Sequence, residues 1–201
     1  MPLARVVALV GQIARGLDEA HRNGVIHRDL KPGNVMIGPG PEGEVAKLLD
    51  FGIAKLDTGL GTQTQGWVGT PRYMAPEQFT GDPVDARTDV YALGLITYEM
   101  LVGRSPFLSD NPMSYVHSHV YAAVPTLQSV APGVVPLAVE AIVLSALAKQ
   151  PQQRPGSAGE FARRLAESVH APAPARSKNA APVVAIVGAA VLGLGVLGGL
   201  G

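Results

Sequence analysis

Hydrophobic residues at the start of the chain recur at the spacing of an amphipathic helix. They lie three or four positions apart, which places them on one helical face over residues 3–20: Leu3, Val6, Val7, Val10, Ile13, Ala14, Leu17 and Ala20. The Asn23-Gly24 pair that follows is typical of a helix C-terminus with a left-handed residue. The sequence therefore predicts an N-terminal helix of about five turns.

Short β-branched runs surround the polar stretch that comes next. Residues 25–26 and 35–37 flank this stretch, and a Gly/Pro-rich segment, 38–43, separates the second run from another at 45–49. The pattern predicts short strands on both sides of residues 27–34. Residues 56–70 show no periodicity, and a loop of that length is usually functional or mobile.

The pattern of apolar and capping residues in the second half of the chain predicts helices. Thr88-Asp89 supplies N-cap chemistry for a segment that is apolar on nearly every face up to Leu101, so this helix should lie in the middle of the domain. Three further helices are expected over residues 113–123, 136–149 and 157–169. Residues 1–169 thus form a mainly α (α+β) domain.

The C-terminal residues differ from the rest in composition. Residues 170–182 are rich in alanine and proline, as in a linker, and residues 183–201 contain no charged side chain. The second segment approaches the ~20 residues of a membrane-spanning helix, although its glycines make it a weak span. Arg176 and Lys178 precede it, which predicts a single-pass cell-membrane protein with a cytoplasmic domain. Its small-xxx-small spacings suggest a homodimer, but chance also produces them readily.

Composition excludes several functions. Lys+Arg and Asp+Glu each number 16 in 201 residues, so no net field attracts nucleic acid. The chain has no cysteine, which excludes a disulfide scaffold, a thiolate nucleophile and a cysteine zinc site. Only oxygen and imidazole ligands remain for a metal.

Residues 27–34 read His-Arg-Asp-Leu-Lys-Pro-Gly-Asn, and Asp50-Phe51-Gly52 begins sixteen positions after Asn34. Phosphoryl transfer needs a carboxylate that orients the attacking hydroxyl and oxygen ligands that hold Mg²⁺ on the nucleotide phosphates. Asp29, Asn34 and Asp50 can supply these groups. For Asp29 the alternative is an ordinary turn aspartate.

These two motifs resemble those of the eukaryotic-like (Hanks-type) serine/threonine protein kinases, of the bacterial membrane-anchored kind. The resemblance implies ATP and Mg²⁺ as cofactors and Ser/Thr-containing proteins as substrates. It implies that Asp29 is the catalytic acid/base and that Asn34 and Asp50 bind the metal. Lys31 would contact the transferred phosphoryl group, and a lysine there resembles serine/threonine specificity.

The same resemblance extends to the segment from Gly69 to Glu77 and beyond. Thr70 would hydrogen-bond near Asp29, and Arg28 would pair with a phosphorylated loop residue, for which Thr62 and Thr64 are the candidates. An unmodified, solvated loop is the alternative reading. The resemblance also implies structural roles for three residues. Glu77 and Arg154 would form a buried ion pair, and Asp89 would either brace the catalytic loop, residues 27–34, or act as a plain N-cap.

The resemblance covers the large lobe of the kinase domain, over residues 3–169. Within this sequence we find no Gly-rich phosphate loop, no Val-Ala-Ile-Lys strand and no partner glutamate. Two hypotheses follow: a truncated kinase chain with weak or no activity alone, or a non-catalytic membrane-tethered module that binds kinases or their substrates. An unrelated helical domain would make the order of the motifs accidental.

Overall fold

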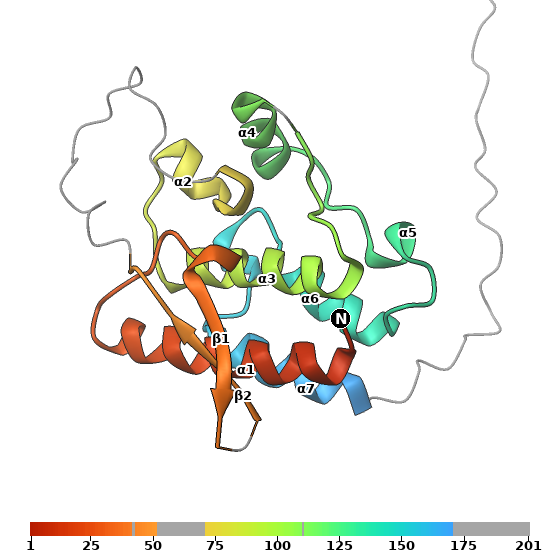
Figure 1. Cartoon of the computed structure of the whole chain (residues 1–201). Helices are drawn as coiled ribbons and strands as arrows, with labels where there is room; N and C mark the ends of the chain where they lie inside the picture. Colours follow the sequence, from red (N-terminus) through yellow and green to blue (C-terminus); the bar gives the residue numbers. More distant parts are fainter. Residues whose placement is uncertain (42, 52–70, 110, 171–201) are drawn as a thin grey trace, which may run out of the picture.

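The computed structural model describes residues 1–41, 43–51, 71–109 and 111–170. Figure 1 shows α3 through the centre, with α1 and α7 on one side and α2 and α4 on the other. The described part is mainly helical with one two-stranded sheet, as the sequence predicts. Its elements are α1 (Leu3–Arg22), η1 (Pro32–Asn34), β1 (Val35–Gly40), β2 (Gly43–Leu48), η3 (Pro71–Tyr73), α2 (Pro76–Thr80), α3 (Ala86–Val102), α4 (Pro112–Val120), α5 (Leu127–Val130), α6 (Leu137–Ala146), η4 (Pro151–Gln153) and α7 (Ala158–His170).

The central helix α3 is buried along most of its length, which confirms the prediction from its apolar pattern. Most of its side chains from Thr88 to Tyr98 are buried. Its N-cap is Asp85, whose side chain accepts a hydrogen bond from the backbone N–H of Arg87, so the predicted cap at Thr88-Asp89 was wrong. The carboxylate of Asp89 is therefore available for other partners.

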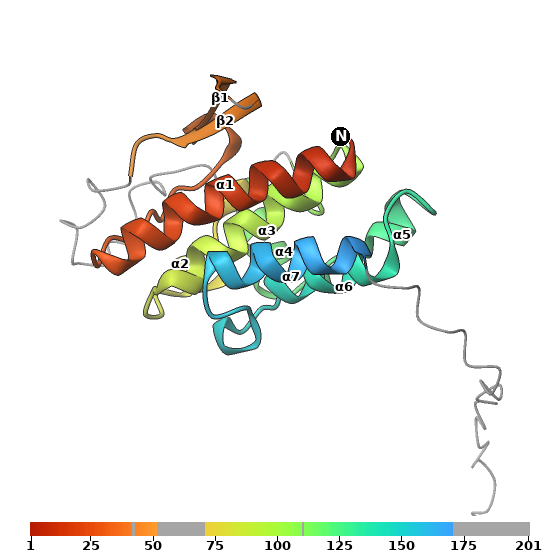
Figure 2. The same ribbon diagram turned by 90° about the horizontal axis from the view of Figure 1, so that it is seen from below.

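Helix α1 begins and ends where its pattern predicts, and its apolar face lies in the core. Gly24 has a φ of 73°, the left-handed conformation expected after the helix. Figure 2 shows α1, α3, α6 and α7 packed side by side. In this packing α3 and α6 approach closely, because a Cβ at Gly94 would lie 2.9 Å from the Cβ of Ala146.

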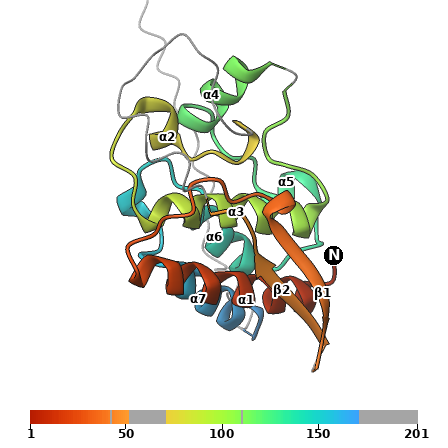
Figure 3. The ribbon, with the colours of Figure 1, turned by 60° about the vertical axis from the view of Figure 1, so that its left-hand side comes forward.

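The hairpin differs in detail from the predicted strands. Residues 25–26 form no strand, and β1 pairs with β2 from Val35↔Leu48 to Gly40↔Gly43, so most of the expected turn belongs to the strands. Pro39 is tolerated because a two-stranded sheet leaves each strand one unpaired edge. The hairpin lies beside α1, and Figure 3 shows it extending past that helix.

The three remaining predicted helices are present with shifted ends. Helix α4 ends before residue 123 and α6 before residue 149, whereas α7 runs one residue past its predicted end. Helices α2 and α5 were not predicted, because four or five residues are too few to show a helical period. The predicted membrane span, 183–201, lies outside the described residues. Among the described helices, none is long and apolar enough to cross a membrane.

Candidate active site

The loop between α1 and β1 brings three of the predicted catalytic residues together. The Nζ of Lys31 donates to the Oδ2 of Asp29 at 2.9 Å, and the Nδ2 of Asn34 donates to the backbone oxygen of Asp29 at 2.8 Å. Asn34 is 7% exposed and sits at the end of η1. Because its amide nitrogen is directed at the loop, its Oδ1 remains as an oxygen ligand.

The backbone of this loop is held by a buried carboxylate. Asp89 of α3 accepts hydrogen bonds from the backbone N–H groups of His27 (2.8 Å) and Arg28 (2.9 Å). Arg28 has a φ of 61°, which a non-glycine residue adopts only at a cost in energy. The two bonds to Asp89 offset this cost and fix the chain direction just before Asp29. Of its two expected roles, Asp89 makes the contacts of a brace.

His21 is a residue that sequence reasoning missed. Its Nε2 lies 2.7 Å from the Oδ2 of Asp89, and its Nδ1 is buried without a hydrogen-bond partner. It occupies the last turn of α1, where a histidine is a common helix-terminal residue. No sequence signal distinguishes that role from a contact with a residue 68 positions away.

Asp50 is brought to the loop through its neighbours. The backbone N–H of Leu49 donates to the backbone oxygen of Asn34 at 2.9 Å, and the Nε2 of His27 lies 3.1 Å from the oxygen of Leu49. The rings of His27 and Phe51 are 4.8 Å apart. Asp50 itself is exposed, with a φ of 48°. The structure thus joins the start of the second motif to the end of the first.

These groups have the donor chemistry that Mg²⁺ prefers. Asn34 offers a neutral oxygen and Asp50 an exposed carboxylate, and Mg²⁺ is usually held by one or two such protein ligands together with water and phosphate oxygens. The described residues contain no group of three or more His, Cys, Asp or Glu that could hold a metal by themselves.

Glu77 and Arg154 form a buried bidentate ion pair. Both guanidinium Nη atoms donate to the carboxylate, at 2.7 and 2.8 Å, and the side chains are 3% and 0% exposed. Thr88 also donates to Glu77. Burial opposes ionisation of Glu77, but the hydrogen bonds and charge of Arg154 outweigh it, so the pKa of Glu77 lies below its ordinary value. The pair ties α2 to the chain just before α7.

The predicted regulatory threonines, Thr62, Thr64 and Thr70, lie outside the described residues, as does Gly52. The segment that follows them is described. It continues through η3 into α2, where Gln78 donates from its side chain to the backbone oxygen of Arg28 at 2.8 Å. The residue that follows the segment from Gly69 to Glu77 thus contacts the loop of residues 27–34.

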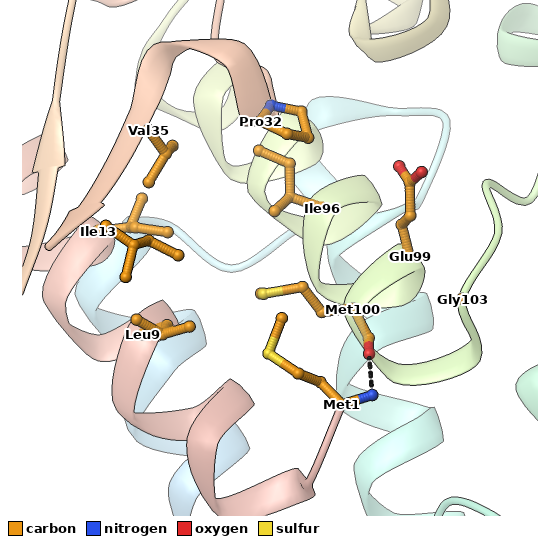
Figure 4. A pocket seen from close by; sticks show the side chains of 10 residues that line it. Met1, Leu9, Ile13, Pro32, Val35, Ile96, Glu99, Met100 and Gly103 are labelled. Carbon is orange, nitrogen blue, oxygen red and sulfur yellow. Dashed lines mark hydrogen bonds between the residues drawn. The ribbon is translucent and has the colours of Figure 1, made fainter. Parts of the chain in front are cut away.

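An apolar pocket lies beneath the catalytic loop, between α1, β1 and α3 (Figure 4). Pro32 and Val35 line one side, and Ile96 and Met100 of α3 line another. Glu99 contributes the acidic side chain among the lining residues. It is turned toward η3, where it accepts hydrogen bonds from Arg72 and from the hydroxyl of Tyr73.

The structure brings a carboxylate paired with a lysine, an amide and a second carboxylate onto adjacent segments, in the arrangement that the resemblance to protein kinases implies. The protein kinase domain family model matches residues 1–168. The chain therefore belongs to the protein kinase family, and the resemblance to Hanks-type kinases is confirmed.

Relatives and solved structures agree with this assignment. Serine/threonine-protein kinase PknD of Mycobacterium tuberculosis is 45% identical over 161 residues, covering 79% of this chain and 24% of PknD. PknB of Mycobacterium leprae is 41% identical over 163 residues, covering 80% of this chain and 26% of PknB. The crystal structure of the Mycobacterium tuberculosis PknI kinase domain superposes with a TM-score of 0.60 at 30% identity, covering 84% of this chain and 56% of that chain. The chain thus spans about a quarter of these curated relatives and represents part of a kinase domain.

Proposed function

We propose that this chain is the catalytic-loop and substrate-binding part of a serine/threonine protein kinase that transfers phosphate from ATP to protein hydroxyls. The observation that carries the proposal is the contact set of Asp29, which meets Lys31 and Asn34 directly and meets Asp50 through the Asn34–Leu49 backbone bond. A scaffold would not require a partly exposed carboxylate paired with a lysine and held by a buried amide. The kinase relatives support the same choice.

Each residue has a role that follows from its chemistry. Asp29 orients the hydroxyl of the substrate serine or threonine and accepts its proton, while Lys31 neutralises charge on the transferred group. Asn34 and Asp50 would hold Mg²⁺, which when bound neutralises charge on the nucleotide phosphates. Asp89 keeps the loop in the strained conformation that presents Asp29. Phosphoryl transfer requires this positioning more than any covalent step by the protein.

The decisive experiment supplies the N-terminal part of a related kinase domain, such as that of PknD, ahead of residue 1. The fusion should transfer labelled phosphate from Mg²⁺-ATP to a threonine peptide, and Asp29→Ala should abolish the transfer. Asp82→Ala, which changes an exposed aspartate elsewhere, is the matched control and should retain activity. Persistent labelling by the Asp29→Ala fusion would falsify the role of Asp29. Capture of substrate without labelling by any fusion would favour the scaffold hypothesis.

For the 201 residues alone we expect weak nucleotide binding, because within the described site the nucleotide would be held mainly through its Mg²⁺, by Asn34 and Asp50. Mg²⁺-ATP should therefore change the melting temperature little or not at all. A rise of several degrees that disappears in Asp50→Asn would contradict this expectation and indicate a self-sufficient nucleotide site.

The proposal extends to regulation and location. Thr62 or Thr64 would be phosphorylated and pair with Arg28, because a phosphate carries about two negative charges that a guanidinium binds well. Residues 183–201 would span the cell membrane as a single helix, and their replacement should leave the kinase fold intact, since residues 1–168 carry the family match. Phosphopeptide mapping of the active fusion tests the first idea. Alkaline extraction of membranes from expressing cells tests the second, and release of the protein would count against it.

A further inference from the structure

Glu99, Arg72 and Tyr73 form a cluster beside the catalytic loop, and the charges of this cluster bear on the choice of substrate. Glu99 of α3 lines the same pocket as Pro32, the residue after Lys31, so the cluster lies next to the catalytic loop. Arg72 and Tyr73 of η3 lie over Glu99 and belong to the segment that leads into α2. Figure 4 shows the Glu99 carboxylate at one side of the pocket.

Each carboxylate oxygen of Glu99 already accepts one hydrogen bond. Its Oε1 accepts from the Nη2 of Arg72 at 2.7 Å, and its Oε2 accepts from the hydroxyl of Tyr73 at 2.7 Å. Burial and the neighbouring Glu99 raise the pKa of Tyr73, so its hydroxyl stays protonated and donates. The positive charge of Arg72 beside Glu99 repels a lysine or arginine on a substrate and offsets part of the attraction that Glu99 would exert on it.

Arg72, by contrast, uses only one of its nitrogen atoms in the pair with Glu99. A guanidinium has five N–H donors, and Glu99 accepts from Nη2 alone in this pair. The side chain of Arg72 is 32% exposed, although its Nε is buried and cannot itself reach a peptide. The group stays charged at any physiological pH. A peptide lying across η3 would therefore meet a partly exposed cation, beside a carboxylate whose charge Arg72 already offsets.

We propose that Arg72 makes this kinase selective for substrates that carry a carboxylate side chain close to the phosphorylated residue, and that it disfavours a basic side chain there. The inference rests on the proposed function, because it assumes that substrate peptides lie beside the catalytic loop. Charge-assisted hydrogen bonds from arginine to carboxylate supply the selectivity.

Peptide binding to the 201-residue chain, without nucleotide, tests the proposal. The first set of fluorescent peptides has a central threonine in an alanine background, with one Glu placed at each neighbouring position in turn. At the position that gives the tightest binding, the affinities of peptides with Glu, Gln and Lys are then compared. We expect the Glu peptide to bind about tenfold more tightly than its Gln isostere at low salt, with Lys weakest, and the difference to shrink as salt is added.

Variants assign the effect to Arg72. Arg72→Gln should remove the preference for Glu over Gln, and Arg72→Glu should reverse it in favour of Lys. Arg87→Gln is the matched control, since Arg87 is a similarly exposed arginine (35%) paired with Asp85 on α3, and it should leave the preference unchanged. Equal affinities for Glu and Gln peptides, absence of binding by any peptide, or an undiminished preference in Arg72→Gln would each overturn the proposal.

The outcome is separable from the proposed function. If the chain discriminates between the peptides while the fusion transfers no phosphate, the selectivity is retained and the proposed kinase activity is lost. A fusion that phosphorylates Glu and Gln peptides with the same kcat/KM would keep the assignment and overturn the selectivity.

Discussion

Two buried carboxylates near the start of α3 bind partners of different kinds. Asp89 is 1% exposed and accepts two backbone N–H bonds and one from His21, whereas Glu77 is 3% exposed and is held by both Nη atoms of Arg154. A carboxylate bonded to backbone amides fixes the shape of one loop. A carboxylate paired with an arginine 77 residues away joins two distant segments. The difference indicates that Asp89 serves the site and the Glu77–Arg154 pair serves the fold.

Breaking the Glu77–Arg154 pair should have the largest effect on stability. Arg154→Met leaves the Glu77 carboxylate buried without its cation, which should lower the free energy of unfolding by about 3–5 kcal/mol. Urea denaturation measures the loss. Arg163→Met, which removes an arginine from an exposed pair with Glu167, is the control and should cost less than about 1 kcal/mol. Equal losses in the two variants would show that the buried pair does not join the segments as described.

The same end of the molecule should also be sensitive to acid. His119 of α4 is fully buried, and its Nδ1 is hydrogen-bonded to the hydroxyl of Tyr91. The Cζ of Arg154 lies over the Tyr91 ring, 4.8 Å from its centroid. Burial, with repulsion from Lys149, lowers the pKa of His119 from 6.5 to about 4. The unfolded chain therefore binds a proton more readily than the folded one between these values.

Stability from His119 is thus fully present above pH 6.5 and is lost as the pH falls toward about 4. The loss should reach about 3 kcal/mol, at 1.36 kcal/mol for each pKa unit. Urea denaturation from pH 7 to pH 5 gives the slope before most carboxylates titrate. His119→Phe should flatten the slope, whereas the exposed His117→Phe should not. A slope that survives in His119→Phe would assign the acid sensitivity to other groups.

Changing Asp89 should act on the loop more than on the whole fold. Asp89→Asn replaces one acceptor oxygen with an NH₂ group that faces backbone donors, at an expected cost of about 1–3 kcal/mol. Hydrogen exchange of the His27 and Arg28 amides should accelerate in this variant, with little change in the α7 amides. Asp85→Asn is the control, because asparagine and aspartate cap helices about equally well. Uniform acceleration across all helices would place Asp89 with Glu77 as a residue of the fold.

The sequence predicts those features whose signals are local. The 3.6-residue period of apolar residues predicts α1. The apolar side chains on nearly every face of residues 90–101 predict the buried position of α3. The catalytic contacts were predictable because all three residues lie within one eight-residue motif. The ion pair was predictable only from the family resemblance, since nothing in residues 77 and 154 themselves indicates that they meet.

Other features depend on contacts that no local pattern records. His21 and His119 look like ordinary helix-end histidines, yet each makes a buried contact with a distant part of α3. The predicted cap of α3, Thr88-Asp89, lies three to four residues after the observed cap, Asp85. These residues have the same capping chemistry, and only the tertiary structure assigns Asp89 to the loop. Polarity shows that a side chain needs a partner but does not identify that partner.

The smallest predicted effect tests whether α1 takes part in holding the catalytic loop. His21→Leu removes one hydrogen bond to Asp89, but it also removes a buried Nδ1 that has no partner, so the net loss should be only about 1 kcal/mol. A double-mutant cycle with Asp89→Asn isolates the contact, and residues in direct contact should show a coupling of about 0.5–3 kcal/mol. His117→Leu, combined with Asp89→Asn, should show none. Zero coupling for His21 would mean that Asp89 holds the loop without help from α1, and that the brace consists of α3 and the loop alone.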